Sequence, residues 1–120
     1  MNKKILIAED EKSYAKALSL KLSNAGYDVA VANNGEEAID FLKKESFDLL
    51  FLDLIMPKVN GFGVLEFIHQ KQISIKVVIF SSLSQKEDVD RSLELGAVEF
   101  VNKSDISISE ALDLAKKYLN

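Results

Sequence analysis

Cysteine is absent from this chain of 120 residues, proline occurs once, and there are only five glycines. Without cysteine, a disulfide framework and a thiolate zinc site are both excluded, which fits a reducing cytoplasm. The scarcity of proline and glycine argues against a linker, a low-complexity tract or an internal repeat. We therefore expect a single domain that spans residues 1–120.

Long apolar runs and an excess of basic charge are missing as well. A membrane-spanning helix needs roughly 20 apolar residues, and no run in this chain comes near that length. Only four apolar residues follow Lys4 before the first acid, too few for a signal peptide. The net charge of −4 and the pI near 5.0 disfavour direct binding to nucleic acid. We expect a cytoplasmic protein that binds neither membranes nor nucleic acid.

The sequence does contain a regular alternation of short apolar runs and amphipathic segments. Strands are predicted at 4–8, 28–32, 49–52, 76–80 and 98–101, and each is followed by a helical pattern. Five strands interleaved with five helices are typical of a doubly wound parallel α/β sheet. For a chain of this size we predict the flavodoxin-like strand order 2-1-3-4-5.

Several local signals mark where the helices begin. Capping boxes are predicted for three pairs, namely Asn34 with Glu37, Ser84 with Glu87, and Ser107 with Glu110. The dipeptide Asn60-Gly61 is interpreted as a turn with positive φ. The helix after Ser84 has a thin apolar face, formed chiefly by Val89 and Leu93, and is predicted to be the most mobile one.

Ionisable or hydroxyl side chains lie within two residues after the end of four of the five predicted strands. They are Glu9 and Asp10 after the first strand, Asp53 after the third, Ser81 after the fourth and Lys103 after the fifth. In an open parallel sheet the carboxyl ends of the strands form the edge at which ligands bind. We therefore expect these side chains to surround one pocket.

This set of side chains favours phosphoryl transfer. Three carboxylates in one pocket repel each other unless a cation joins them, and oxygen ligands without histidine or cysteine favour Mg²⁺ over zinc. Asp53 is then a candidate nucleophile. The metal, the Lys103 ammonium and the Ser81 hydroxyl are placed to stabilise the charge on the transferred group.

With these residues in place, the sequence resembles the receiver (REC) domain of bacterial two-component response regulators, in particular the single-domain chemotaxis regulators. The resemblance covers essentially the whole chain and rests on the motifs Ile7–Glu11, Leu52–Pro57, Asn60-Gly61, Ile79–Ser82, Gly96-Ala97 and Phe100–Lys103. It implies that Asp53 accepts a phosphoryl group from a phosphohistidine of a sensor histidine kinase or phosphotransfer protein. It further implies a Mg²⁺ cofactor held by Asp10, Asp53, the backbone carbonyl of Ile55 and, directly or through water, Glu9.

The resemblance also implies a switch rather than an enzyme, with at most slow self-dephosphorylation. Ser81 would move towards the phosphoryl group, Lys103 would pair with it, and Phe100 would be the aromatic switch residue. The face built from the fourth helix, the fifth strand and the fifth helix would then change its affinity for a downstream target protein or output domain. Because the sequence begins at Met1 and ends with one domain, we expect a free-standing regulator over a receiver excised from a longer protein.

The sequence departs from the common family pattern at two places. Glu9 stands where aspartate is more usual, and its extra methylene alters the reach of the carboxylate. Ser104 follows Lys103 where the family commonly has a cis proline. Because a non-proline cis bond costs about 2.5–4 kcal/mol, we predict a trans bond, or a looser loop that positions Lys103 differently.

The residues two positions after Asp53 and Ser81 bear on the lifetime of the phosphorylated state. They are Ile55 and Leu83, and neither side chain can orient a water molecule for hydrolysis. The sequence therefore predicts slow self-dephosphorylation relative to receivers with polar residues there.

Three other functions are compatible with the fold class. A degenerate receiver would bind a partner without phosphorylation, and the altered Glu9 and Ser104 keep this alternative open. An aspartate-nucleophile phosphohydrolase needs a second acid where this chain has Ile55. A flavin-binding electron carrier would need a phosphate loop where Glu9, Asp10 and Glu11 repel phosphate. The only histidine, His69, is expected on the surface and not as a phosphodonor.

Overall fold

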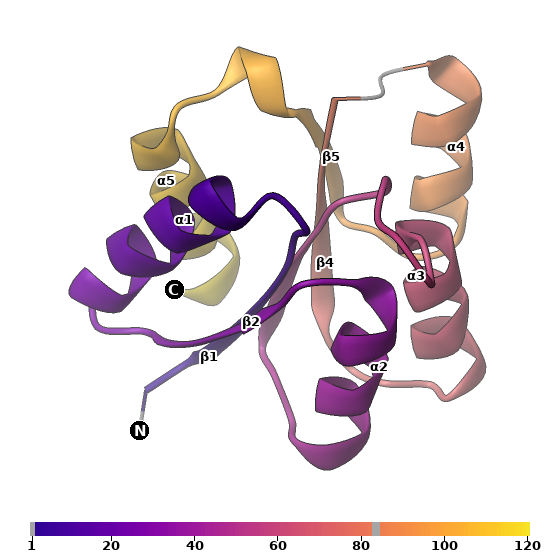
Figure 1. Cartoon of the computed structure of the whole chain (residues 1–120), viewed down its shortest axis with the longest axis horizontal. Coiled ribbons are helices and arrows are strands. Elements are labelled where there is room, and N and C mark those ends of the chain that lie inside the picture. The colour runs from indigo at the N-terminus through magenta and orange to yellow at the C-terminus, as the bar shows by residue number, and fades with distance from the viewer. Residues whose placement is uncertain (1, 83–84) are drawn as a thin grey trace.

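The computed structural model describes residues 2–82 and 85–120. A five-stranded parallel sheet has the order β2-β1-β3-β4-β5, which confirms the predicted fold and strand order (Figure 1). The strands are β1 Lys4–Ala8, β2 Asp28–Ala32, β3 Leu49–Leu52, β4 Lys76–Ser81 and β5 Glu99–Asn102. The helices are α1 Lys12–Asn24, α2 Gly35–Lys44, α3 Gly61–Gln70, α4 Lys86–Glu94 and α5 Ile108–Leu119, with a short 3₁₀ turn at Lys103–Asp105.

Both faces of the sheet are covered by helices, with α1 and α5 on one face and α2, α3 and α4 on the other (Figure 1). Alternate residues of a strand therefore serve two cores: Ile7 and Phe51 pack on the α1/α5 side, and Leu6 and Leu50 on the other side. Burial of each such side chain contributes about 1.5–3 kcal/mol. This two-sided burial explains why β3 reads as a continuous apolar run.

The register of the sheet brings the ends of neighbouring strands to a common edge. Ala8 of β1 pairs with Leu52 of β3, and Ser81 of β4 pairs with Asn102 of β5. The chain continues in register just past β3, because the Asp53 N–H donates to the Ala8 carbonyl over 3.0 Å. The polar residues that follow these strands consequently emerge side by side.

Two of the three predicted capping motifs cap a helix. Asn34 accepts the Glu37 N–H over 2.8 Å, although the Glu37 carboxylate returns to the Asn33 N–H, at 2.8 Å, and not to the N–H of Asn34. Ser107 and Glu110 form a complete capping box at the start of α5.

The predicted capping box of Ser84 and Glu87 lies partly outside the described residues, because Ser84 is not among them. The described helix α4 has Gln85 as its N-cap, without a capping bond from the Gln85 side chain. The predicted apolar face of α4 was wrong, because Leu93 is 44% exposed and the buried residue of the helix is Ser92. Because the buried position of this helix is occupied by a serine, the pattern of apolar residues does not identify the face that packs on the sheet.

The interpretation of Asn60-Gly61 as a turn with positive φ was wrong too. Asn60 has a φ of −77° and is the N-cap of α3, where its side chain accepts the Gly63 N–H. The positive φ of this loop, 68°, belongs to Lys58. Glycine is needed at position 61 because a Cβ there would lie 2.5 Å from the Asp53 carbonyl oxygen.

Within the described part of the chain, no helix combines the length and the apolar character needed to cross a membrane.

Candidate functional site

Three carboxylates gather at the carboxyl edge of the sheet. Glu9 and Asp53 are buried, with exposures of 3% and 6%, whereas Asp10 is exposed. One oxygen from each of the three residues lies within 4.8 Å of the other two. The sequence-based expectation that these side chains converge is therefore correct.

Lys103 reaches the same place from the end of β5. Its Nζ forms an ion pair with Glu9 Oε1 and lies 3.1 Å from Asp53 Oδ2. The ammonium thus bridges two buried carboxylates that would otherwise repel each other at close range. It is itself sheltered, because its side chain is only 15% exposed.

The loop that carries Lys103 is held without a proline. All peptide bonds of the described residues are trans, so the predicted trans bond between Lys103 and Ser104 is confirmed. The Asn102 side chain accepts hydrogen bonds from the Ser104 N–H, over 3.0 Å, and from the Ser104 hydroxyl, over 2.7 Å. These contacts cap the 3₁₀ turn at its first residue and fix the backbone from which Lys103 extends.

Backbone N–H groups complete the polar contacts of the two buried acids. The Glu11 N–H donates to Glu9 Oε2 over 3.1 Å, and the Ile55 N–H donates to Asp53 Oδ1 over 3.1 Å. Each buried carboxylate therefore uses one oxygen for a backbone donor and the other for the Lys103 ammonium. This pairing is what makes their burial tolerable.

The surroundings of Glu9 and of Lys103 raise the pKa of both groups. Burial raises the pKa of Glu9 to about 7, and the hydrogen bonds from Lys103 and from the Glu11 N–H offset only part of this effect. Burial alone would lower the pKa of Lys103, but the hydrogen bonds and charges of Glu9 and Asp53 outweigh it and raise that pKa. The site is thus short of positive charge, as expected of one that takes up a cation.

The raised pKa of Glu9 predicts a pH dependence of stability. Since this carboxyl binds its proton more tightly in the folded than in the unfolded chain, its contribution is complete below pH 4.5 and is lost as the pH rises to about 7. Without metal, the wild type should lose about 2–3 kcal/mol relative to Glu9→Gln over this range. Urea unfolding of both proteins in a chelator, from pH 4.5 to 8, measures the difference.

A difference between the two proteins that stays constant, or grows in favour of the wild type as the pH rises, would contradict this prediction. Saturating Mg²⁺ serves as the second arm of the experiment. Because a bound cation favours the ionised carboxylate, it should flatten the dependence in the wild type and change the Gln variant little.

Of the other predicted site residues, Ser81 and Ile55 lie at this edge, whereas Phe100 lies within β5, where it pairs with Ile79. Ser81 is buried at the end of β4. Ile55 is 48% exposed and sits beside Asp53, to which it donates its N–H. Phe100 is half-buried in β5 and packs against the core on the α2/α3 side. Leu83 lies outside the described residues, and His69 is exposed as expected.

Sequence reasoning missed one residue of the site, Tyr14 in the first turn of α1. The Lys103 Nζ lies 4.9 Å from the centre of its ring. No sequence pattern identified it, because Tyr14 and Lys103 are distant in the chain and meet only in the folded structure.

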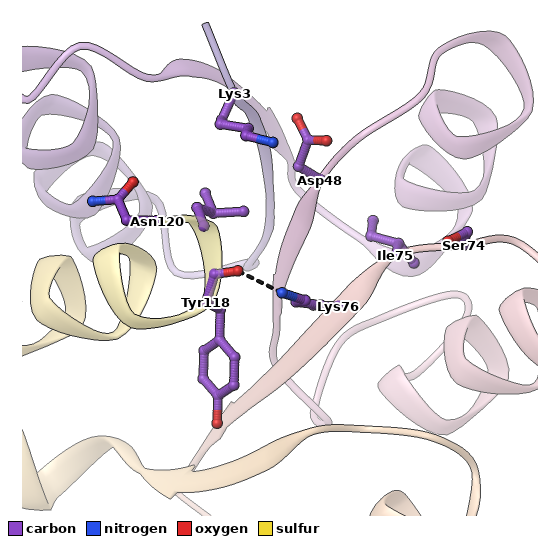
Figure 2. A pocket seen from close by; sticks show the side chains of 8 residues that line it. Lys3, Asp48, Ser74, Ile75, Lys76, Tyr118 and Asn120 are labelled. Atoms are coloured by element: carbon purple, nitrogen blue, oxygen red, sulfur yellow. Dashed lines mark hydrogen bonds between the residues drawn. The ribbon is translucent and has the colours of Figure 1, made fainter.

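A separate hollow lies at the opposite edge of the sheet, at the amino ends of the strands (Figure 2). Two of the charged side chains that line it are engaged within the chain. Lys76 Nζ donates to the Tyr118 carbonyl over 2.7 Å, and the Asp48 carboxylate accepts the Lys4 N–H over 2.8 Å. The convergent acids and their ammonium are at the other edge, to which we assign the functional site.

The chemistry of the donors at this site fits Mg²⁺. The acidic cluster consists of carboxylates alone, and hard oxygen ligands in small number, with room for water, are what this ion prefers. Asp10 is the exposed member of the cluster and so the natural point of entry for a hydrated ion. Glu9, Asp10 and Asp53 are the residues that would hold it.

Comparison with known proteins gives a consistent result. Residues 5–113 match the family described as "Response regulator receiver domain". Among curated proteins, the chain is 36% identical over 103 residues to the alkaline phosphatase synthesis transcriptional regulatory protein PhoP of Bacillus subtilis, covering 86% of this chain and 43% of PhoP. It is 40% identical over 100 residues to the probable transcriptional regulator ycf27 of Porphyridium aerugineum, covering 83% and 41%. The chain thus spans less than half the length of these relatives.

Solved structures agree in fold over almost the full chain. The receiver domain of the Francisella response regulator 1452 superimposes with a TM-score of 0.90 at 28% identity, covering 98% of this chain and 96% of the other. The response regulator TrrA of Thermotoga maritima, solved in complex with Mg²⁺-BeF, superimposes with a TM-score of 0.84 at 32% identity, covering 98% and 99%.

Proposed function

The chain belongs to the response regulator receiver domain family, and on this premise we propose that it is a phosphorylation-operated switch in which Asp53 accepts the phosphoryl group. One observation carries the proposal. The buried Asp53 carboxylate lies 3.1 Å from the Lys103 ammonium, and it has an oxygen within 4.8 Å of carboxylate oxygens of Glu9 and Asp10, close enough for one metal ion to bind all three. An anionic nucleophile, a cation-binding cluster and a fixed ammonium are the parts that phosphoryl transfer needs.

The transfer itself requires little covalent chemistry from the protein. A carboxylate oxygen of Asp53 forms the new O–P bond while the P–N bond to a phosphohistidine of the donor breaks. The electron pair of the broken bond returns to the imidazole nitrogen. Lys103 leaves its ion pair with Glu9 and stabilises an oxygen of the transferred group, and the Ser81 hydroxyl donates a hydrogen bond to another.

Mg²⁺, when bound, would neutralise the negative charge that the phosphoryl oxygens bring to the three carboxylates. Asp10 and Asp53 would be direct ligands, together with the backbone carbonyl of Ile55. Glu9, which is longer than the usual aspartate, would bind directly or through water. The TrrA structure with Mg²⁺-BeF supports this cofactor for a relative of the same fold.

The output would be read on the surface formed by α4, β5 and α5. A shallow groove between β5 and α5 is lined in part by Phe100, the proposed aromatic switch residue, and by acids that include Glu99 and Asp113. A rearrangement of Ser81 and Phe100 would therefore change this groove. We propose a cytoplasmic sensor histidine kinase or phosphotransfer protein upstream and a target protein or output domain downstream.

The lifetime of the phosphorylated state gives a further prediction. Ile55, 48% exposed beside Asp53, cannot orient water, and Leu83 is proposed to flank the same entrance. Replacing both with Asn or Glu should accelerate loss of the phosphoryl group about tenfold, below the roughly 10²–10⁴ that a fully positioned acid or base contributes, because the introduced groups are not held in place. Decay of radiolabel after removal of the donor measures the rate.

Leu20→Asn is a suitable control, since Leu20 has a similar exposure, 54% against 48% for Ile55, but lies on α1 away from the predicted entrance. It should leave the decay unchanged. A decay that stays the same or becomes slower in the Ile55 and Leu83 variant would contradict the proposed cause of slow hydrolysis.

Beryllofluoride with Mg²⁺ distinguishes this function from that of a receiver that acts without phosphorylation. The phosphorylation switch predicts saturable binding that requires both components and shifts the amide resonances of the site and of the α4-β5-α5 surface. A degenerate receiver would show no Mg²⁺-dependent shifts with beryllofluoride, and that result would replace the proposed function with a phosphorylation-independent binding module.

A further inference from the structure

The aromatic ring of Tyr14 links two parts of the site that lie far apart in the sequence. Lys103 Nζ is 4.9 Å from the centre of this ring, inside the range of a cation–π interaction. Tyr14 belongs to α1 and Lys103 to the turn after β5, and β1 and β5 are separated in the sheet by β3 and β4. The contact therefore closes the site from the α1 side.

The position of this ring is fixed by its surroundings. Tyr14 packs against the core that contains Leu18, Phe51 and Phe80. The narrow void that these residues line together with Glu9 and Asp53 leaves no space for a water molecule. The Tyr14 ring is thus held in place by tight packing on the core.

The Tyr14 hydroxyl does not account for this placement. It is buried and has no hydrogen-bond partner among the described residues. An unpaired buried hydroxyl is unfavourable. Besides its packing on the core, the contact that the structure shows for this side chain is the one between its ring and the Lys103 ammonium.

Lys103 needs a support that does not depend on the state of the site. Its two carboxylate partners, Glu9 and Asp53, are also candidate metal ligands, so their charge is shared with a bound cation. A neutral ring keeps its attraction for an ammonium whether or not the carboxylates are engaged. The backbone of the turn is capped by Asn102, but this contact does not reach the end of the lysine side chain.

We propose that Tyr14 is a positioning residue that seats the Lys103 ammonium beside Asp53 through its ring, in the resting and in the phosphorylated state. The expected effect of Tyr14 on phosphorylation rests on the proposed function. Its effect on the position of the Lys103 side chain does not. Two variants separate the ring from the hydroxyl. Tyr14→Phe keeps the ring, whereas Tyr14→Leu fills much of the space and removes it.

The first measurement is spectroscopic and needs no phosphorylation. In NMR spectra, the Cε protons of Lys103 should show an upfield ring-current shift in the wild type and in Tyr14→Phe, with and without Mg²⁺ and beryllofluoride. The shift should disappear in Tyr14→Leu. A lysine resonance that is the same in all three proteins would overturn the proposal.

The second measurement is the initial rate of Asp53 phosphorylation by acetyl phosphate at saturating Mg²⁺, in the wild-type background and in Lys103→Gln. Tyr14→Leu should lower the rate about 5- to 30-fold, the equivalent of about 1–2 kcal/mol, and Tyr14→Phe should stay within about twofold of the wild type. In Lys103→Gln, the Phe and Leu variants should react equally.

The outcomes are distinct. An equal loss from Tyr14→Leu in both backgrounds would indicate a general effect on folding and would overturn the proposal. So would a Phe variant that is as slow as the Leu variant, since that result would assign the effect to the hydroxyl. If the wild type itself is not phosphorylated, the proposed function fails while the ring-current test still decides the placement of Lys103.

Discussion

Asp53→Asn is expected to abolish phosphorylation of the protein by any donor. The amide keeps the shape of the side chain and can still accept the Ile55 N–H, which now bonds Asp53 Oδ1 over 3.1 Å. It carries no anionic oxygen, however, and cannot form the O–P bond. The rate of phosphorylation by acetyl phosphate with Mg²⁺, followed by intact mass, should fall below detection.

Asp40→Asn is the matched control for this variant, because Asp40 is an exposed residue of α2. It should be phosphorylated at the wild-type rate. The thermal midpoint of Asp53→Asn should remain close to that of the wild type, which excludes unfolding as the cause. Phosphorylation that persists in Asp53→Asn would show that another residue is the acceptor.

Lys103→Met is expected to have the second-largest effect, on both reactivity and stability. Its ammonium is the proposed partner of the transferred group, and removal of one such fixed charge typically costs about 10²–10³ in rate. The substitution also leaves Glu9 and Asp53 buried without their ion pair. We therefore expect the metal-free protein at neutral pH to lose about 3 kcal/mol of its free energy of unfolding.

Lys86→Met provides the control for stability, because Lys86 makes its ion pair with Asp90 on the surface and is 86% exposed. Such pairs contribute little to stability in water, so this variant should unfold at nearly the same urea concentration as the wild type. Mg²⁺ should restore part of the stability of Lys103→Met, since the cation takes over the neutralisation of the acids. Equal, small losses in both variants would contradict the assigned role of the buried ion pair.

The fold and most of the site could be predicted from the sequence. Both depend on where the apolar strands end and on which polar residues follow them. The apolar run Leu49–Leu52 followed by Asp53 identifies a strand buried on both faces, and parallel strands bring their carboxyl ends to one edge. The contact between Lys103 and Asp53, 50 residues apart in the chain, follows from that topology alone.

The remaining features depend on side-chain contacts that the sequence does not encode locally. Tyr14 reads as an ordinary amphipathic position, and only the tertiary structure places Lys103 on its ring. Asn102 caps the 3₁₀ turn and holds its backbone, although Ser104 stands where the family commonly has proline. The spacing of residues in the sequence did not predict this hydrogen bond. For α4, the scarcity of apolar residues left the helical register undetermined, so Leu93 was assigned to the wrong face.

Phosphorylation of Asp53 is tested most directly by the mass of each peptide after incubation of the wild-type protein with a small phosphodonor, in Mg²⁺ and in a chelator. We expect one added phosphoryl group, located on the peptide that contains Asp53, in the presence of Mg²⁺ and almost none without it. An unmodified Asp53 peptide in both conditions, from a protein shown to be folded, would contradict it.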